Sequence, residues 1–401
     1  MFKKELLRLE FHQLVNYGPS LLNRDQSGNV KEIKVGGVRR VRISGPSYKS
    51  AMRNYGPVDA IRTRRLFTII ADRLYEFKNE DGTNKYSEEY VASAIELLKT
   101  FFGAKSIKKT KEGETITATS ITYSKEYDIQ AIVDFFTENY ETAEAINKVI
   151  AMKDNAKKKD EAYAKFYEGC KNRKLGAHIS MYGRMVVDAI CEPVESAICM
   201  NHAYTINQIN GDTDYFAAIE EYVKTGERTG ASMLDTTNIE SGCFYRYASV
   251  DMNTLFANLC IGEDLTEEGV IEKINQMTES EIIDFFEKFL KVAPVAKQHS
   301  SATSPNPIIT CVRISECGYP TTMDDVFEKA ITRTSRATVA EQGIEKFSEF
   351  MTDDTYETIG LVKQFVIMNK NKKEFIDDSI EILNEKEAKQ TLRDYIKESL
   401  Q

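Results

Sequence analysis

The sequence contains no apolar run that approaches the roughly 18 residues needed to span a bilayer. Its first residues, MFKKE at positions 1–5, include no apolar stretch of the length that a secretory signal peptide needs. Hydrophobic residues make up 42% and charged residues 29% of the 401 positions, as in ordinary soluble globular proteins. We therefore expect a cytoplasmic protein without membrane contacts, built either from two or three domains or from one core with large insertions.

The sequence also lacks the cysteine and histidine spacings that are typical of metal sites and disulfide frameworks. The cysteines number seven, which is odd, and no two of them stand in a C-x-x-C arrangement. We interpret them as buried, reduced thiols. The four histidines, His12, His178, His202 and His299, are far apart and form no H-x-x-H or H-E-x-x-H pattern. The sequence therefore predicts no metal site.

No motif for catalysis or for a bound cofactor is present. GPSYKS at positions 45–50 superficially resembles a phosphate-binding loop, but Tyr48 stands before Lys49 where that motif needs glycine. The chain has no G-x-G-x-x-G after an expected strand and no G-x-S-x-G. We interpret His178 and His202 as core or edge residues rather than as catalytic bases. These absences favour binding over catalysis, with no catalytic residue and no cofactor.

The sequence does contain a strong separation of charge. Its formal net charge is −9, yet residues 24–65 hold eleven Lys or Arg and only three Asp or Glu. This segment carries +8, which leaves −17 for the rest of the chain. One face should therefore attract phosphate groups, while the remainder keeps the protein soluble.

An expected strand and helix carry this positive charge. Alternation places Val41 and Ile43 on one face of a strand, and the Arg-rich positions on the other. The segment SGP at 44–46 predicts a helix start, with serine or glycine as the cap and proline in the first turn. Helical spacing then puts Lys49 and Arg53 on the face of the helix that also holds Pro46 and Ser50. Free N–H groups beside these cations predict an anion site.

Hydrophobic periodicity predicts a helical insertion followed by a return to strands. A first half-buried strand at 6–15 ends at YGPS, positions 17–20. Helices are expected at 61–77, 87–102, 129–136 and 143–166, with a hairpin near 111–113. Later strands are expected at 177–181, 200–207, 232–239, 244–250 and 308–314. Later helices are expected at 212–223, 267–277, 279–291 and 322–331, and over most of the acidic last 60 residues. With the insertion and the arm set aside, the order of expected strands and helices along the chain fits a modified β-α-β-β-α-β sheet.

Six segments of the chain resemble the CasC family, the repeated backbone subunit of the type I-E CRISPR surveillance complex Cascade. They occur in the same order as in that family and span positions 6 to about 331. They are PSLLNRD (19–25), GGVRRVRIS (36–44), KSAMR (49–53), YGRM (182–185), SGCFYRYASVDMNTL (241–255) and AKQHSSA (296–302).

The resemblance implies an α+β fold shaped like a hand. An RRM-like (ferredoxin-like) antiparallel sheet would form the palm from 1–58, 176–199 and 243–401. A helical fingers insertion would occupy 59–175, and a β-hairpin-like thumb 200–242. Such a noncatalytic subunit polymerises along the guide RNA and presents its bases for pairing with target DNA in antiviral defence. The implied partners are CRISPR RNA, target DNA, neighbouring copies and the subunits CasA, CasB, CasD and CasE.

The resemblance also implies particular binding residues. Those expected near RNA are Asn23, Arg24, Lys31, Ser44, Lys49, Arg53, Gly183, Arg184, Met185, Lys297 and Gln298. Met185 would insert between bases, and the run Lys157, Lys158, Lys159 would face target DNA; without the resemblance, that run is a solvated helix surface. The chain departs from the family pattern at Pro46 and Ser50, where glutamine and arginine are usual.

Two other functions remain open. One is a CRISPR-associated endoribonuclease that processes repeat RNA, with His12, His178 or His202 as its candidate catalytic groups. The other is a small-molecule enzyme that holds a nucleotide phosphate near the glycine pair 36–37 and the helix start at 44–49. Incubation with repeat RNA, with and without Mg²⁺, separates the first alternative from a binding protein.

Overall fold

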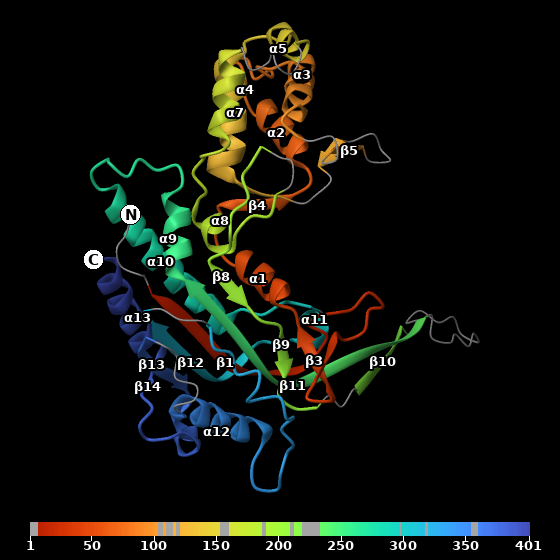
Figure 1. Cartoon of the computed structure of the whole chain (residues 1–401). Helices are drawn as coiled ribbons and strands as arrows, with labels where there is room; N and C mark the ends of the chain where they lie inside the picture. Colours follow the sequence, from red (N-terminus) through yellow and green to blue (C-terminus); the bar gives the residue numbers. More distant parts are fainter. Residues whose placement is uncertain are drawn as a thin grey trace, which may run out of the picture. The chain divides into compact units, whose positions relative to one another are not determined.

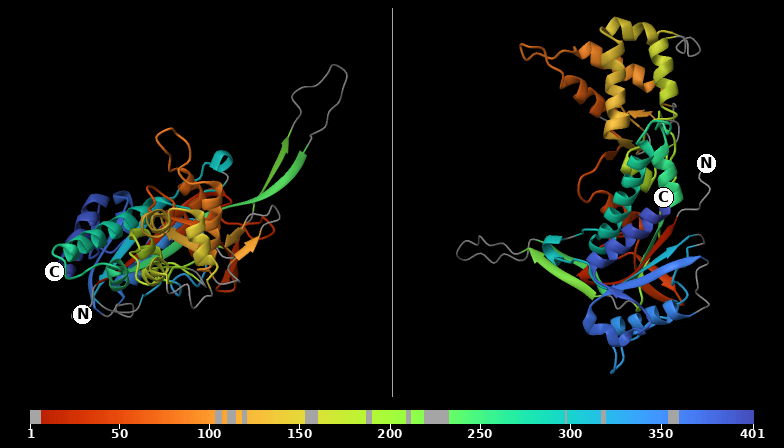
Figure 2. Two further views of the ribbon diagram at one scale, coloured as in Figure 1. Left: turned by 90° about the horizontal axis from the view of Figure 1, so that it is seen from above. Right: turned by 90° about the vertical axis from the view of Figure 1, so that its left-hand side faces the viewer.

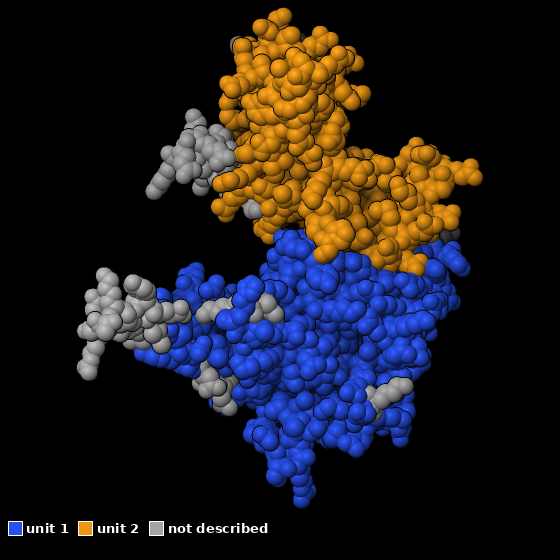
Figure 3. Space-filling model, turned by 180° about the vertical axis from the view of Figure 1, so that it is seen from behind, with its two compact units in different colours: residues 1–55, 198–252, 282–401 blue, residues 56–197, 253–281 orange. Residues whose placement is uncertain are grey.

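The computed structural model describes residues 7–102, 107–109, 115–117, 121–152, 160–186, 190–208, 212–218, 233–296, 298–316, 320–353 and 360–401. The chain folds into two compact units, each assembled from separate stretches of sequence (Figure 3). Unit 1 comprises Met1–Tyr55, Ile198–Met252 and Ile282–Gln401, and unit 2 comprises Gly56–Ala197 and Asn253–Glu281. The expected insertion at 59–175 lies within unit 2, which also holds 176–197 and 253–281.

Unit 1 is built on one large sheet (Figure 1). Its strands are β1 (Arg8–Ser20), β2 (Glu32–Val35), β3 (Val38–Ile43), β8 (Ile198–Met200), β9 (Ala203–Thr205), β10 (Asp212–Ala218), β11 (Met233–Asp251), β12 (Asn306–Ser315), β13 (Leu361–Met368) and β14 (Ile382–Leu383). The strand order is β14-β13-β12-β1-β11-β9-β3-β2, and β8 and β10 also pair with β11. The pairings are antiparallel except for β13 with β14. The α+β class and the mostly antiparallel sheet are therefore confirmed.

The central strand β1 is buried on both faces. Phe11 packs its ring 5.6–5.9 Å from the rings of Phe285, Phe286 and Phe289 in α10 (Val270–Lys291). The opposite face of β1 meets α12 (Val339–Thr352), where the ring of Phe350 lies near His12. Helices on both faces explain why β1 has no exposed polar side, in contrast to the half-buried strand that we expected.

The other helices of unit 1 are α1 (Gly45–Arg53), α11 (Gln298–Ser301), the 3₁₀ helix η4 (Lys370–Phe375) and α13 (Glu385–Leu400). Capping boxes begin α12 at Thr338 and α13 at Asn384, so these starts are strongly specified by local sequence. α13 lies beside the end of α10, since Lys389 pairs with Glu287 at 2.6 Å.

Unit 2 is mainly helical. Its helices are α2 (Leu66–Tyr75), α3 (Glu88–Lys99), the π-helix η2 (Lys125–Gln130), α4 (Ala131–Asn139), α5 (Ala143–Ile150), α7 (Glu161–Gly169) and α8 (Ala177–Tyr182), and most of α9 (Met252–Cys260) also belongs here. Two small antiparallel pairs join β4 (Ala60–Thr63) to β7 (Ile121–Ser124), and β5 (Ile107–Lys109) to β6 (Thr115–Thr117). Stacked aromatic rings such as Phe135 and Phe166, 4.3 Å apart, fill the core.

Several expected elements are confirmed. The strand at 6–15 is β1, although it continues through the expected break to Ser20 with a register shift. The helix after 44 is α1, and the strands at 244–250 and 308–314 lie in β11 and β12. The expected hairpin near 111–113 has its strands in β5 and β6, while the turn itself lies outside the described residues.

Other expectations were wrong. The expected strand at 177–181 is helix α8, and the expected helix at 61–77 begins with strand β4. The two helices expected at 267–291 are one helix, α10, whereas 322–331 forms turns. The C-terminal 60 residues include strand β13 between two helices. For β4 and β13, pairing with strands distant in the sequence overrode local preference.

The expected arm of the sheet has a different pairing. We predicted that 200–207 would pair with 232–239 and that 212–223 would be a helix. Instead β10 pairs with the first part of β11, from Asp212 with Ile239 to Ala218 with Met233. The segments β8 and β9 pair with the later part of β11. The resulting hairpin projects away from the rest of the sheet (Figure 2).

Candidate nucleic-acid interface

Backbone hydrogen bonds join several of the expected RNA-contacting residues in unit 1. The Lys31 N–H donates to the Asn23 carbonyl at 2.9 Å, and the Arg42 N–H donates to the Lys31 carbonyl at 2.8 Å. The Ser44 N–H donates to Oδ1 of Asn23 at 3.2 Å. Asn23 therefore holds the loop before β2 against the end of β3 and the start of α1.

The loop that carries Arg24 is fixed by a local turn. The Asp25 carboxylate accepts the N–H groups of Ser27 and Asn29, both at 2.9 Å. Gly28 has a φ of +86°, a conformation that suits glycine. Arg24 pairs with Val30 across the base of this loop, and its side chain is exposed. Asp25 thus has a structural role inside a cationic segment.

Arg42 and His202 complete this surface, although neither was among the expected RNA contacts. His202 was expected as a core or edge residue, or as a candidate catalytic group of the alternative endoribonuclease. Nη1 of Arg42 lies 3.0 Å from Nδ1 of His202. An arginine can only donate, so Nδ1 must accept and the proton of the neutral imidazole is on Nε2. Desolvation and then the charges of Arg42 and Lys31 lower the pKa of His202. Sequence spacing gives no sign of His202, because the turn between β8 and β9 brings it here.

We refer to Asn23, Arg24, Lys31, Arg42, Ser44 and His202 together as the cationic platform. Its cations are Arg24, Lys31 and Arg42. The adjacent Arg39 differs, since its Nε donates to Glu32 at 2.6 Å. A surface with this concentration of donors suits phosphate groups.

Helix α1 begins beside the platform. Ser44 is the N-cap residue with extended backbone angles, but its side chain makes no capping hydrogen bond. Proline occupies the first turn and no acidic residue is present there, as we predicted. The helix buries Tyr48 and Met52. A Cβ on Gly45 would lie 2.6 Å from the Met200 carbonyl oxygen, so this glycine permits close approach of α1 to β8.

Lys49 and Arg53 follow on α1, and both are half-buried. Nζ of Lys49 donates to the Ile198 carbonyl at 2.5 Å, which ties the helix to β8. Burial lowers the pKa of Lys49 from its ordinary value. Lys49 therefore has a structural contact, and its contact with RNA stays a prediction, as does that of Arg53.

Two arginines of the segments that resemble the CasC family, Arg40 and Arg246, are buried in unit 1. Arg40 in β3 donates to the carbonyl oxygens of Thr205, at 3.3 Å, and Glu328, at 2.5 Å. Arg246, from the FYRY motif, donates to the Val292 carbonyl at 3.0 Å and stacks over the Phe289 ring. These arginines stabilise the sheet and do not contribute to an exposed cationic surface.

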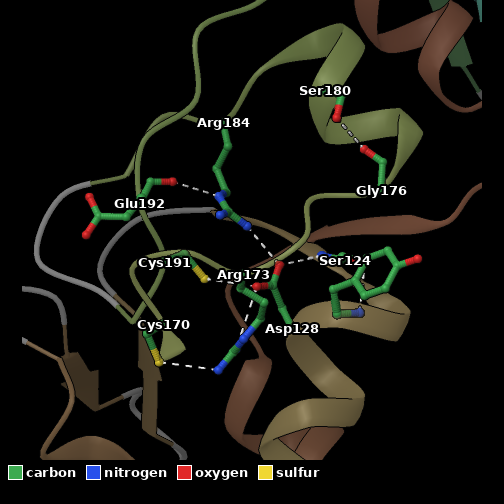
Figure 4. Close-up of polar contacts among 10 residues, drawn as sticks. Ser124, Asp128, Cys170, Arg173, Gly176, Ser180, Arg184, Cys191 and Glu192 are labelled. Atoms are coloured by element: carbon green, nitrogen blue, oxygen red, sulfur yellow. Dashed lines mark hydrogen bonds and ion pairs between the residues drawn. The ribbon is translucent and has the colours of Figure 1, made fainter. Parts of the chain in front are cut away.

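Arg184 of the YGRM motif is likewise buried, within unit 2 (Figure 4). Its Nη1 lies 2.8 Å from Oδ2 of Asp128, and its Nε donates to the Glu192 carbonyl at 3.0 Å. Asp128 also accepts the Ser124 N–H at 2.7 Å. The guanidinium of Arg184 thus organises the interior of unit 2, and its contact with RNA stays a prediction that this geometry does not favour.

The neighbouring Met185 is 88% exposed. Gly183 has a φ of +75°, and a Cβ there would lie 2.8 Å from the Ser196 backbone nitrogen. Only glycine fits this close approach, which together with the Arg184 ion pair fixes the segment from which Met185 projects. The side chain is exposed to solvent, and its insertion between bases stays a prediction.

The other expected contact residues are Lys157, Lys158, Lys159, Lys297 and Gln298. The run Lys157, Lys158, Lys159 lies outside the described residues, and so does Lys297. The backbone of Gln298 begins the short helix α11.

The histidines proposed for an endoribonuclease have different partners: Tyr245 for His12, Arg42 for His202 and Asp59 for His178. His12 in unit 1 is fully buried, with Nδ1 at 3.2 Å from the Tyr245 hydroxyl, and burial holds its pKa well below its usual value. His178 in unit 2 lies 3.7 Å from an Asp59 carboxylate oxygen. Within the described ranges, no three His, Cys, Asp or Glu side chains gather to hold a metal ion. No helix there is long and apolar enough to cross a bilayer.

The fold and this surface define a class: a two-unit α+β protein with a cationic platform at the edge of a large antiparallel sheet. The chain matches the family model Cas_CT1975, described as CT1975-like protein, over residues 9–398, and it belongs to this family. No curated protein matches the sequence.

Two solved structures with a similar fold are chains of CRISPR complexes. A chain described as "CRISPR RNA-guided surveillance complex, pre-nicking" matches 98% of this chain and 100% of its own, with a TM-score of 0.73 and 20% identity. A second chain, described as "CRISPR RNA-guided surveillance complex", matches 98% of this chain and 99% of its own, with a TM-score of 0.62 and 18% identity. At these identities the similarity concerns the fold.

Proposed function

We propose that this chain is a noncatalytic backbone subunit of a Cascade-type surveillance complex, where it binds the CRISPR guide RNA. The observation that carries the proposal is the cationic platform, which lies on a fold shared with chains of RNA-guided surveillance complexes. Phosphate contacts hold a single strand without reading its sequence, so the bases remain available to pair with target DNA.

Many copies along one RNA would make this function effective. Each platform offers few phosphate contacts, so a single copy binds weakly and with a small salt dependence. Contacts between neighbouring copies add cooperativity. In the finer CasC-like role, unit 1 serves as an RRM-like palm, unit 2 contains the fingers, and the β10–β11 hairpin serves as the thumb. CasA, CasB, CasD and CasE type subunits would then be its protein partners.

The remaining expected contacts fit this role. Met185 would insert between bases, and Lys157 to Lys159 would contact target DNA. Lys297 and Gln298 would approach the RNA or the next copy. Arg40, Arg184 and Arg246 would act only through the fold, because their guanidinium groups are already bonded inside it.

The test is binding of a labelled repeat-spacer RNA over a range of salt and protein concentrations. The variant Lys31→Glu with Arg42→Glu reverses two platform charges. Charge-assisted hydrogen bonds are worth about 1.5–3 kcal/mol each, so we expect at least about a tenfold loss of affinity. The salt slope should also fall, by about 0.7 for each lost contact with a single strand.

A matched control is Lys386→Glu with Lys397→Glu, which reverses two exposed lysines on α13. It changes the net charge equally but leaves the platform intact, so its affinity should stay close to that of the wild type. Absence of RNA binding by the wild type at low salt, or an equal loss in the control, would overturn the proposal. Cleavage of the RNA in Mg²⁺ that EDTA prevents would replace it with an endoribonuclease.

A further inference from the structure

A pocket of about 560 Å³ opens on unit 1 against the outer face of α1. One wall is made by Ser47, Ser50, Asn54 and Tyr55. The other wall runs from Lys291 to Val295 and includes residues 303–305. The first three wall residues follow the i, i+3, i+7 spacing of one helix face. The platform lies at the start of the same helix, so the pocket is next to the surface proposed to hold phosphates.

The pocket is close to electrically neutral. Among the described residues that line it, Lys291 carries the charge, and its Nζ pairs with the Glu385 carboxylate at 2.8 Å. The polar groups in the wall are hydroxyls and the Asn54 amide, which donates to the Ser50 carbonyl at 2.9 Å. Such a lining suits an uncharged polar group better than a phosphate.

Apolar and aromatic surface is exposed at the rim. The Tyr55 side chain is 57% exposed and Val295 is 76% exposed. Single-stranded nucleic acids are bound by stacking of bases on exposed aromatic rings, with polar groups reaching the base edges. Tyr55 together with the hydroxyl and amide groups provides both kinds of contact.

The charge pattern along α1 matches the two ends of a nucleotide. By helical spacing, Lys49 and Arg53 lie to one side of Ser50 on α1, and the pocket-lining Ser47 and Asn54 lie to its other side. Lys49 and Arg53 are both cations, although Lys49 also bonds the Ile198 carbonyl. A phosphate on the cationic face would place its neutral base toward the neutral pocket.

The residue just before Thr303 in the pocket wall has an unusual backbone conformation. Ala302 has a φ of +47°, the one positive value among the described residues other than glycine. The next residue, Thr303, lines the pocket and donates through Oγ1 to the Pro19 carbonyl at 3.3 Å. Strained backbone of this kind persists where the surroundings hold it, often at binding sites.

We infer that this pocket binds one unpaired nucleobase of the RNA whose phosphates lie along α1 and the platform. The inference rests on the proposed function and adds a base-binding site to it. A side chain from a partner protein is the competing occupant, and the experiment distinguishes the two.

The experiment compares a short single-stranded RNA with copies that carry one abasic position, scanned along the strand. Stacking of a base on an aromatic ring makes an abasic site costly, so the wild type should lose about tenfold in affinity at the most sensitive position. Ser50→Trp fills the pocket, and this abasic penalty should fall below about twofold. Tyr55→Ala removes the aromatic ring without filling the pocket, and it should also reduce the abasic penalty.

Ala92→Trp is the control, because Ala92 is exposed on α3 and lies outside the pocket. It should keep the full abasic penalty. An equal penalty in Ser50→Trp and the wild type, with both binding RNA, would overturn the pocket and leave the proposed function standing. If Ser50→Trp instead weakened only the association of protein subunits, the occupant would be a protein side chain. Failure of the wild type to bind any RNA would overturn the proposed function itself.

Discussion

At the scale of single residues, position in the fold separates arginines that stabilise the protein from those that can meet a ligand. Arg40, Arg184 and Arg246 all stand in segments that resemble the CasC family, yet each guanidinium is bonded inside its unit. Arg42 differs, since it lies at the surface against a neutral imidazole. An arginine in a matched motif is therefore not by itself a contact residue.

The Arg184–Asp128 pair leads to a prediction about stability. Both side chains are almost fully buried, so Asp128→Asn would leave a buried guanidinium without its counter-charge. We expect the free energy of unfolding, measured in urea, to fall by about 3 kcal/mol. Asp72→Asn, an exposed change on α2, should alter it by less than about 0.5 kcal/mol. Equal stability of the two variants would contradict a structural role for Arg184.

His202 leads to a prediction about pH. Arg42 and Lys31, together with desolvation, lower its pKa in the free protein. A phosphate on the platform adds negative charge and should raise that pKa, so binding takes up a proton. RNA affinity should therefore increase as pH falls from 8 to 6, by at most about tenfold per pH unit for one proton.

Two substitutions at the same position isolate this effect. His202→Gln is always neutral and His202→Lys is always charged, so both should give affinities that vary less with pH than the wild type. The lysine variant should bind more tightly at pH 8, as measured by titration of labelled RNA. An unchanged pH profile in both variants would show that His202 does not face the RNA.

At the scale of elements, the β10–β11 hairpin shows how tertiary pairing overrides local pattern. The segment DTDYFAAIEEYV at 212–223 has helical spacing of its apolar residues, which led us to expect a helix. As a strand, its first part gains a ladder of hydrogen bonds with β11 that runs from Asp212 to Ala218. Because the partner strand is distant in sequence, periodicity within a short window could not predict this outcome.

The hairpin also exposes large apolar side chains. Tyr215 is 64% exposed and Met233 is 53% exposed. If it contacts a neighbouring copy, Tyr215→Ser with Met233→Ser should reduce the cooperativity of RNA binding. The free energy of unfolding should stay within about 0.5 kcal/mol, because these side chains bury little surface in the chain itself.

The matched control for the hairpin removes two exposed apolar side chains elsewhere, through Leu265→Ser with Val362→Ser. This variant should keep the wild-type cooperativity and stoichiometry, measured by mass photometry along a long RNA. A hairpin variant that assembles as the wild type does would argue against the thumb role.

At the scale of the whole molecule, charge is divided between a cationic segment and an acidic remainder. Residues 24–65 carry +8 in a chain with a net charge of −9. Not all of this positive charge reaches solvent, since Arg40 is buried and Arg39 pairs with Glu32. The platform holds three of the remaining cations, which can attract phosphate over about one Debye length, and further exposed cations lie at Lys34 and at positions 62, 64 and 65.

The acidic remainder should limit nonspecific contacts with DNA. The triple variant Glu345→Gln, Glu374→Gln and Glu398→Gln neutralises exposed carboxylates on or near the C-terminal helices. We expect stronger binding to random duplex DNA at low salt, with the affinity for guide RNA changed far less. Unchanged duplex binding in an electrophoretic shift assay would contradict this screening role.

The resemblance to the CasC family implied the mostly antiparallel α+β class. The sequence by itself determined three local features: the strand core of β1, the start of α1 at Ser44 and the division of charge. Each depends on residues close together in the chain, through alternation, capping and composition. It also indicated Asn23, Lys31 and Ser44, through family-like segments, as parts of one surface.

Only the tertiary structure decided which side chains face that surface. The burial of Arg184 against Asp128, the approach of His202 to Arg42 and the strand conformation of β10 all depend on residues tens of positions apart. The same is true of the pocket, whose walls come from α1 and from positions beyond 290. Long-range packing selects among local conformations of similar free energy, and no short window of sequence contains that information.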